Sequence, residues 1–299
     1  MSTLPELRQL RYFVAVAEEL NFTRAAKRLN LAQPPLSAQI KRLERALGVS
    51  LFERTSRHVE LTPAGKALLT GARRTLAEAQ RTVASSQHAG MGQVDTLRVG
   101  ITDSAALSVL TRIVRRFRTE FPTVYLDLRD GTSLGQIEAV RAGAVDVALT
   151  RGPVSESTLT VEVLVQERLC LAVSDRHPLA RRRQVMWAEL SSQPMILFPR
   201  QLAPAFHDLI MAGCQRAGFS PNVAYEASEI QTILSFVAAE LGVAVVAESV
   251  RNARRAGVII RPLGDAPVWA PLLAICRPER KVAALTAFLR YARMKTRAE

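Results

Sequence analysis

The sequence predicts a mainly helical N-terminal domain and a larger α/β domain, joined by one long helix. Three observations support this prediction. Residues 5–62 have the pattern of short amphipathic helices with tight turns, followed by a small β segment at Val59–Leu61. A helical pattern then begins at Pro63 and continues to residue 89. From Thr96 onward, short apolar segments alternate with helical segments, which is typical of an α/β domain.

Domain boundaries follow from the same patterns. The chain has 299 residues, of which 48% are hydrophobic, and this is enough for two or three globular units. The segment 85–95 contains two glycines and little apolar content, as linkers do. We expect an N-terminal domain, a linker helix and an α/β domain at 1–62, 63–89 and 90–299. We also expect the α/β domain to divide into two subdomains, approximately 90–165 with 269–299, and 166–268.

The charge distribution favours a polyanionic partner for the N-terminal part. The net charge is +13. The first 92 residues contain 14 Lys and Arg against 7 Asp and Glu, whereas the other 207 contain 26 against 20. The basic excess per residue is therefore higher at the N-terminus, which suits nucleic acid. Apolar runs are shorter than the roughly 18 to 20 residues that cross a bilayer, and charges interrupt the N-terminal segment, so we expect a cytoplasmic protein without membrane contact.

Cysteine and histidine spacing gives no sign of a metal site or a disulfide framework. Cys170, Cys214 and Cys276 are odd in number, widely separated and set in apolar surroundings, which predicts buried, inert thiols. A redox-sensing pair is the alternative. The four histidines have no ligand spacing, and the usual nucleophile, phosphate-loop and zinc-protease motifs are missing from the sequence. We expect no catalytic residues, no metal and no cofactor.

The segment 23–47 has the pattern of a helix-turn-helix. Thr23 can cap a first helix, a turn follows at 31–33, and Pro34 and Pro35 stand where a second helix begins. Apolar residues of the second helix repeat at 4,3,4 spacing and predict a buried stripe, namely Leu36, Ile40, Leu43 and Leu47. The opposite face is left for solvent or DNA.

Polar residues on that face suit DNA recognition. Gln33, Ser37 and Gln39 can hydrogen-bond base edges, while Lys41 and Arg42 can neutralise phosphates. After Gly48, a strand, a basic turn and a returning strand predict a wing along the DNA backbone. For each basic residue alone, a solvated surface charge is an equally good interpretation. The predicted DNA-binding set is Gln33, Pro34, Pro35, Ser37, Gln39, Lys41, Arg42, Arg54 and Arg57.

The predicted linker helix carries an apolar seam with the 3,4,3,4 spacing of a short coiled coil. Its residues are Leu69, Ala72, Leu76, Ala79 and Val83. Charged residues occupy the other faces, so we expect dimerisation through this seam. The alternative is a helix that packs on its own domain.

The α/β part is predicted from seven apolar segments and five helical ones. The strand candidates are 97–101, 124–129, 145–150, 169–173, 195–198, 243–247 and 272–276. The helix candidates are 104–120, 133–143, 203–217, 229–241 and 280–294. This alternation predicts parallel sheets with ligand crevices beyond the carboxyl ends of the strands.

Residues 6–65 resemble the DNA-binding domain of the LysR-type transcriptional regulators. The resemblance continues through LRVG at 97–100, HPLA at 177–180 and EIQTILSFVAAELGVAVV at 229–246, so it covers essentially the whole chain. It implies a winged helix-turn-helix, a dimerising linker helix and a two-lobed effector domain similar to periplasmic solute-binding proteins. It also implies operator DNA, RNA polymerase and further copies of the chain as partners, with homodimers assembling into homotetramers.

Within the family the chain is most similar to the branch that controls aromatic-compound catabolism. The similarity lies in QPPLS, FPRQLAPAF and EIQTILSFVAA. It implies a small carboxylate or aromatic-degradation metabolite as the effector. Motif position and the ends of the first two strands predict the effector-binding residues Thr102, Ser104, Thr132, Ser133, Arg151, Pro204 and Phe206. Ordinary helix caps, and an ion pair of Arg151 with Glu167, are the structural alternatives.

Three positions depart from the family pattern. Asp103 places negative charge beside the proposed anion-binding loop, which weakens the case for a dianionic effector. Ala247 stands where relatives often have proline, and Ala38 where some have a basic residue. A redox-responsive regulator of the same family and a solute-binding protein are the alternative functions. We expect effector binding to shift the angle between the lobes and thereby the spacing of DNA-bound recognition helices.

Overall fold

The computed structural model describes residues 4–54, 59–89, 95–154, 156–264, 268–279 and 283–293. The chain forms two compact units. The first consists of Met1–Met91 with Arg141–Ala144, and the second of Gly92–Val140 with Val145–Glu299.

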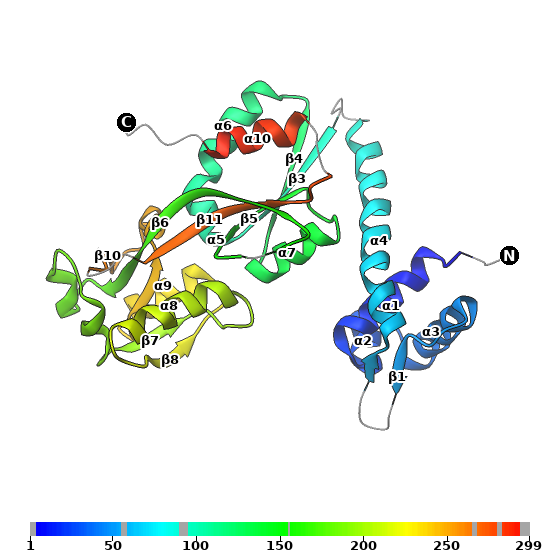
Figure 1. Ribbon diagram of the computed structural model, residues 1–299, viewed down its shortest axis with the longest axis horizontal. Helices are drawn as coiled ribbons and strands as arrows, with labels where there is room; N and C mark the ends of the chain where they lie inside the picture. The colour runs from blue at the N-terminus through cyan, green and yellow to red at the C-terminus, as the bar shows by residue number, and fades with distance from the viewer. Residues whose placement is uncertain are drawn as a thin grey trace. The chain divides into compact units, whose positions relative to one another are not determined.

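The first unit is a helical domain with one β-hairpin (Figure 1). Its elements are α1 (Leu7–Glu19), α2 (Phe22–Arg28), α3 (Gln33–Leu47), β1 (Phe52–Arg54), β2 (Val59–Leu61) and α4 (Pro63–Ala89). The predicted start of α2 was wrong by two residues. Asn21, and not Thr23, is the cap, because the Asn21 side chain accepts a hydrogen bond from the Arg24 N–H at 3.0 Å.

The predicted stripe of the second helix forms the centre of this domain. Leu36, Ile40 and Leu43 are fully buried, and Leu47 packs beside them. They meet α1 and α2 in one core, which includes the fully buried Phe13. Burying one face of α3 in this way leaves its other face at the surface, which is the polarity that the spacing predicted.

The junction between the hairpin and α4 is fixed by two small residues. The Thr62 hydroxyl accepts from the Gly65 N–H at 2.9 Å and donates to the Ser50 carbonyl at 2.7 Å, so it caps α4. At Gly65 a Cβ atom would lie 2.2 Å from the Leu51 carbonyl oxygen. The first turn of α4 therefore packs directly on the backbone that leads into β1.

The seam of the long helix is used largely inside the domain. Leu69, Ala72 and Leu76 join the core around α1, and Arg73 of α4 pairs with Glu18 of α1 at 2.9 Å. Ala79 is half-buried, whereas Val83 is 60% exposed. Packing on the helix's own domain, the alternative in the sequence, thus accounts for the first three seam residues.

The second unit is built on a seven-stranded mixed sheet and a separate two-stranded sheet. Its strands are β3 (Asp95–Ile101), β4 (Val124–Asp130), β5 (Val147–Arg151), β6 (Thr160–Ser174), β7 (Pro194–Leu197), β8 (Asn222–Glu226), β9 (Ala244–Ala247), β10 (Val258–Pro262) and β11 (Trp269–Cys276). Its α-helices are α5 (Asp103–Ala105), α6 (Thr111–Glu120), α7 (Ser133–Arg141), α8 (Pro204–Arg216), α9 (Ile230–Ala238) and α10 (Ala283–Arg293). A π-helical turn at Ala106–Leu110 separates α5 from α6.

The prediction of parallel sheets was only partly right. β3 runs parallel to β4 and β5, and β7 runs parallel to β8. However, β9, β10 and β11 all run antiparallel to β6, and β11 also runs antiparallel to β5. Alternating strands and helices predict a parallel sheet when consecutive strands are neighbours in the sheet. Here β6 instead pairs with three strands that come much later in the sequence, β9, β10 and β11.

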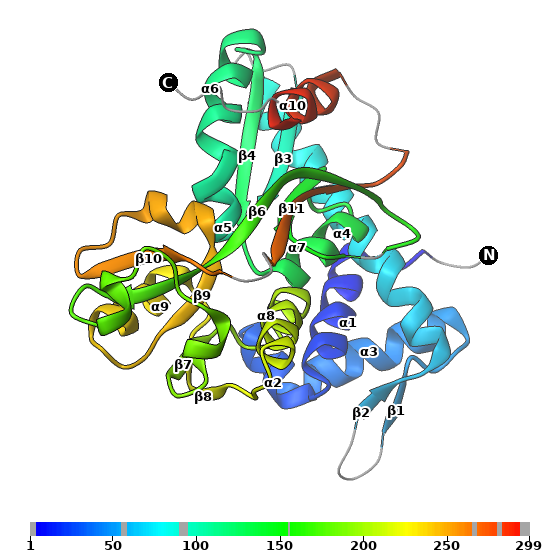
Figure 2. The ribbon, with the colours of Figure 1, turned by 60° about the vertical axis from the view of Figure 1, so that its left-hand side comes forward.

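The long strand β6 divides the second unit into two lobes (Figure 2). Its first half pairs with β11, and its second half pairs with β9 and β10. One lobe has a core of β3, β5, α6 and α10 residues. The other has cores built from the second half of β6, β7, α8, α9 and β9. Both β6 and β11 contribute residues to the two lobes.

Candidate functional site

The exposed face of α3 carries most of the predicted DNA-binding residues. Gln33, Pro34 and Pro35 are exposed in its first turn. Lys41 and Arg42 are exposed further along, and within the described residues they make no ion pair. Their charge is therefore available to a partner.

Two predicted base-reading residues are less accessible. Ser37 and Gln39 are half-buried, and the Gln39 Oε1 atom is buried without a hydrogen-bond partner among the described residues. The amide group of Gln39 is thus set partly into the helix surface. Arg24 and Arg28 on α2 are exposed but pair with Glu19 and Glu18 at 3.3 and 2.8 Å, so their charges are partly compensated within the domain.

The predicted wing corresponds to the β1–β2 hairpin, in which Arg54 pairs in register with Val59. Arg54 ends β1. Arg57 lies in 55–58, outside the described residues. Both strands of the hairpin were predicted from the sequence, and they follow α3 in the chain.

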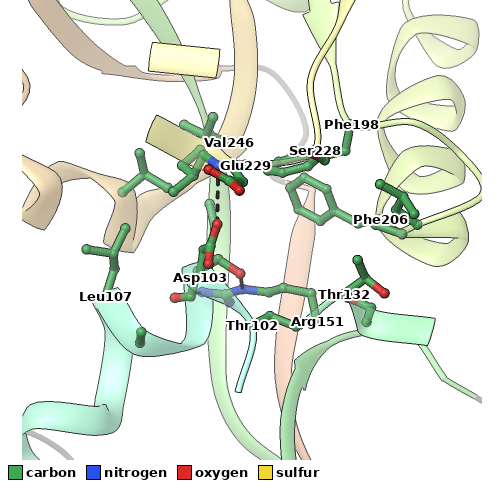
Figure 3. Close-up of a pocket in the computed structure, with 18 of the residues that line it drawn as sticks. Thr102, Asp103, Leu107, Thr132, Arg151, Phe198, Phe206, Ser228, Glu229 and Val246 are labelled. Carbon is green, nitrogen blue, oxygen red and sulfur yellow. Dashed lines mark hydrogen bonds between the residues drawn. The ribbon is translucent and has the colours of Figure 1, made fainter. Parts of the chain in front are cut away.

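A cavity of about 530 Å³ lies between the two lobes of the second unit (Figure 3). That volume is in the range of small-molecule sites. It brings together six of the seven predicted effector-binding residues, namely Thr102, Ser104, Thr132, Ser133, Arg151 and Phe206. Pro204 is not part of the lining; it occupies the first turn of α8, where proline is favoured, and places Phe206 in the wall.

Arg151 is held in a buried ion pair, as the structural alternative predicted. Its Nη2 atom lies 2.9 Å from Glu167 Oε2, and the arginine is 3% exposed. The hydroxyl of Ser108 also donates to Glu167, and the Ser249 N–H does so at 3.1 Å. Burial by itself raises the pKa of Glu167, but Arg151 and these hydrogen bonds outweigh it and hold that pKa below its usual value.

Hydrogen bonds across the cavity join the two lobes. The Ile230 N–H at the start of α9 donates to Asp103 Oδ2 at 3.4 Å. The Asn252 side chain donates to the Leu107 carbonyl at 2.8 Å. In addition, Arg151 of β5 donates to the Ser249 hydroxyl at 3.0 Å. These polar contacts hold the lobes together at and near the cavity, in addition to strands β6 and β11, which run through both lobes.

Sequence reasoning missed several lining residues. Asp130 is the last residue of β4, and Glu229 immediately precedes α9, so the strand-end and helix-start rules that found Thr102 and Thr132 apply to both. Phe198 follows β7 and lies beside Phe206, with ring centroids 6.2 Å apart. Nothing in its spacing distinguishes Phe198 from an ordinary core residue.

The three cysteines are buried and free. Burial raises the pKa of the Cys214 thiol to about 11, and it is also the main cause of the raised pKa values of Cys170 and Cys276. Thiols of this kind are poor nucleophiles, so this chemistry does not favour the redox alternative. Within the described ranges no cluster of metal-ligating side chains occurs, and no helix is long and apolar enough to span a membrane.

Comparison with known proteins assigns both parts of the chain. Residues 7–66 match the bacterial regulatory helix-turn-helix proteins of the lysR family, and residues 91–297 match the LysR substrate binding domain. The regulator TfdS of Cupriavidus pinatubonensis is 38% identical over 288 residues, covering 96% of this chain and 98% of its own. AlsR of Bacillus subtilis is 37% identical over 247 residues, covering 83% and 82%.

A solved structure extends this likeness to a DNA complex. Full-length CbnR complexed with its target DNA is similar with a TM-score of 0.68 and 32% identity, covering 97% of this chain and 99% of that one. The helix-turn-helix, the two-lobed α/β domain and these matches agree with one another. The chain belongs to the LysR family of DNA-binding transcriptional regulators, with an N-terminal helix-turn-helix and an effector-binding domain.

Proposed function

We propose that α3 is the recognition helix and that its first turns read the bases of operator DNA. Gln33, Ser37 and Gln39 are the proposed base contacts, and Pro34 and Pro35 fix the start of the helix. The observation that carries this proposal is the division of α3 into a buried apolar face and an exposed polar one. Lys41, Arg42, Arg54 and Arg57 are the proposed phosphate contacts.

The interlobe cavity is the proposed effector site. It has the size of a small-molecule pocket, and both lobes contribute to its wall. The QPPLS, FPRQLAPAF and EIQTILSFVAA segments support a place in the branch that regulates aromatic-compound catabolism. Two phenylalanines in the cavity wall, Phe198 and Phe206, give an aromatic ligand an apolar surface to pack on.

Effector binding is proposed to act through the angle between the lobes. Cross-lobe hydrogen bonds at Asp103 and Asn252 are the contacts that a ligand in the cavity would alter. In a homodimer or homotetramer, such a shift changes the spacing of the recognition helices and the bend of the DNA. We propose that the part of α4 around the exposed Val83 contributes to the contact between two copies of the chain. The regulator would work in the cytoplasm with operator DNA and RNA polymerase, without catalysing a reaction.

The test of the DNA-reading proposal uses the full-length chain. Operator sequences are selected from a random DNA pool, and affinity is then measured against salt concentration for the wild type and for Lys41→Ala. Loss of one phosphate contact should lower affinity on all sequences and reduce the salt slope by about 0.9. Arg176→Ala, an exposed arginine of the second unit, is the matched control and should leave the slope unchanged. Equal slopes for wild type and Lys41→Ala would contradict the assignment.

A further inference from the structure

Acidic side chains outnumber basic ones around the interlobe cavity. Among the described residues that line it, Asp103, Asp130 and Glu229 are acidic, and Arg151 is the one with positive charge. We infer that the effector is a small amine with an aromatic or apolar body, bound as its ammonium ion, rather than a carboxylate. This inference rests on the proposed function, because it names the ligand chemistry of the same cavity.

Arg151 does not compensate this acidic excess for a ligand, because its charge is already paired. Glu167 lies 2.9 Å away and is itself 7% exposed. The other guanidinium contacts go to the hydroxyls of Ser249 and Ser104 at 3.0 and 3.3 Å, and to the Ala270 carbonyl at 3.3 Å. A ligand carboxylate would have to take Arg151 from a buried carboxylate that has several hydrogen bonds of its own, which is costly.

Three backbone donors at the helix starts around the cavity already have acceptors within the chain. The N-terminus of α9 faces a carboxylate of the protein itself, since the Ile230 N–H donates to Asp103. At the start of α7, Leu134 donates to the Leu202 carbonyl at 3.4 Å and Gly135 donates to the Thr132 hydroxyl at 3.1 Å. Helix N-termini commonly bind anionic ligands through such N–H groups. For these three donors the chain itself supplies the acceptor, and one acceptor, Asp103, is an anion.

The remaining wall suits the body of an aromatic amine. Phe198 and Phe206 form an edge-to-face pair on one side, and Leu107 and Val246 lie on the other side of the view in Figure 3. Apolar walls bury the body of the ligand, while the face of an aromatic ring attracts an ammonium group. The same rings give no such attraction to a carboxylate.

The two lobes place carboxylates on facing walls of the cavity. Asp103 begins α5 in one lobe, and Glu229 caps α9 in the other. In Figure 3, Glu229 lies above Asp103, and the dashed line marks the hydrogen bond between Asp103 and the start of α9. An ammonium group between them offsets their mutual repulsion and holds the lobes together. The charge of the ligand is thereby coupled to the angle between the lobes, which is the quantity that the proposed function requires to change.

The experiment compares ligands of equal shape and different charge on the full-length protein. The probes are phenethylamine, hydrocinnamate and phenethyl alcohol, together with the shorter pair benzylamine and benzoate. Binding is measured by calorimetry and by the rise in the melting temperature, because a ligand of the folded state raises it. Asp103→Asn and Glu229→Gln remove one cavity charge each, and Glu279→Gln, an exposed acid outside the lining, is the matched control.

We expect at least one amine to bind about tenfold or more tightly than its carboxylate counterpart, with the alcohol between them. Each cavity variant should reduce that ratio, whereas Glu279→Gln should keep it. A carboxylate that binds as tightly as its amine counterpart, or a panel in which no amine binds at millimolar concentration, would overturn the inference.

The operator footprint separates failure of this inference from failure of the proposed function. If a carboxylate binds and changes the footprint, the cavity is an effector site and only its assigned charge is wrong. If a probe of either charge binds without changing the footprint, the effector role itself fails.

Discussion

The helix α3, which we propose as the recognition helix, and the interlobe cavity differ in how their basic residues are placed. On α3, Lys41 and Arg42 are exposed, so their charges face solvent. In the cavity, Arg151 is buried, and its charge is compensated by an ion pair with Glu167. An arginine at a predicted ligand site is therefore evidence for an anionic ligand only when its charge is not already paired inside the protein.

The largest expected effect lies in the buried pair. Glu167→Gln leaves Arg151 as an uncompensated buried charge, so we expect a loss of about 3 to 5 kcal/mol in the free energy of unfolding. Urea unfolding of the full-length protein measures it. Glu279→Gln, an exposed acid, should change stability by less than about 0.5 kcal/mol. A loss below about 1 kcal/mol for Glu167→Gln would show that Arg151 is not dependent on this partner.

The same pair predicts a pH dependence. The pKa of Glu167 is lowered in the folded state, so its contribution to stability is present above the unfolded value of about 4.3 and is lost as pH falls through the folded value. Wild-type stability should therefore fall more steeply than that of Glu167→Gln on acidification from about pH 5 to pH 3. Parallel curves for the two proteins in chemical unfolding would exclude this carboxylate as the cause.

Two glycines of α4 provide a matched test of how the first turn of α4 packs on the segment that leads into β1. Gly65→Ala places a Cβ 2.2 Å from the Leu51 carbonyl, and we expect it to destabilise the protein by about 1 to 3 kcal/mol. Gly71→Ala meets nothing within 4 Å and should stabilise the helix by up to about 1 kcal/mol. Thermal unfolding distinguishes them, and a neutral Gly65→Ala would mean that the first turn of α4 can move away from β1.

Substitutions on α3 should distinguish residues that read bases from residues that bind phosphates. Gln39→Ala should cost about 1 to 3 kcal/mol on the selected operator and little on scrambled DNA. Arg42→Ala should weaken both and reduce the salt dependence. Fluorescence anisotropy with both DNAs at several salt concentrations measures the difference. An equal loss of specificity in the two variants would remove the distinction between their roles.

The smallest expected effect concerns the start of α2. Asn21→Ala removes the side chain that caps the helix and should cost about 1 kcal/mol. Thr23→Ala, at the position predicted from the sequence, should cost less than about 0.5 kcal/mol. Urea unfolding measures both, and the reverse order would restore the sequence-based assignment.

The helical domain could be predicted well because its information is local. The stripe of Leu36, Ile40 and Leu43 follows from spacing alone, and these residues are fully buried. The cap of α2 was misplaced because Asn21 and Thr23 are both good capping residues, and only the Arg24 N–H decides between them. Likewise, spacing could not tell that Leu69 and Leu76 pack on the α1 core before they reach another chain.

The α/β part was less predictable because its information is distant in sequence. β8 has only five residues and is exposed along its whole length, so its three apolar residues are too few to predict a strand, while the first half of β6 alternates weakly. For the cavity, strand ends predicted Thr102, Ser104, Thr132 and Ser133 correctly as lining residues. The net charge of the cavity wall was not predictable in this way. It depends on Glu167, which pairs with Arg151, and on Glu229, and both are far in sequence from those strand ends.

The most direct test of the central claim is the footprint of the full-length regulator on its selected operator, with and without the panel probe that binds. The claim is that occupation of the interlobe cavity changes how α3 is presented to DNA. It predicts that the bound probe changes the extent of the protected DNA or its bending, and that Phe206→Trp, which fills part of the cavity, abolishes this response while operator binding persists. A probe that binds the wild type and leaves footprint and transcription unchanged would contradict the claim.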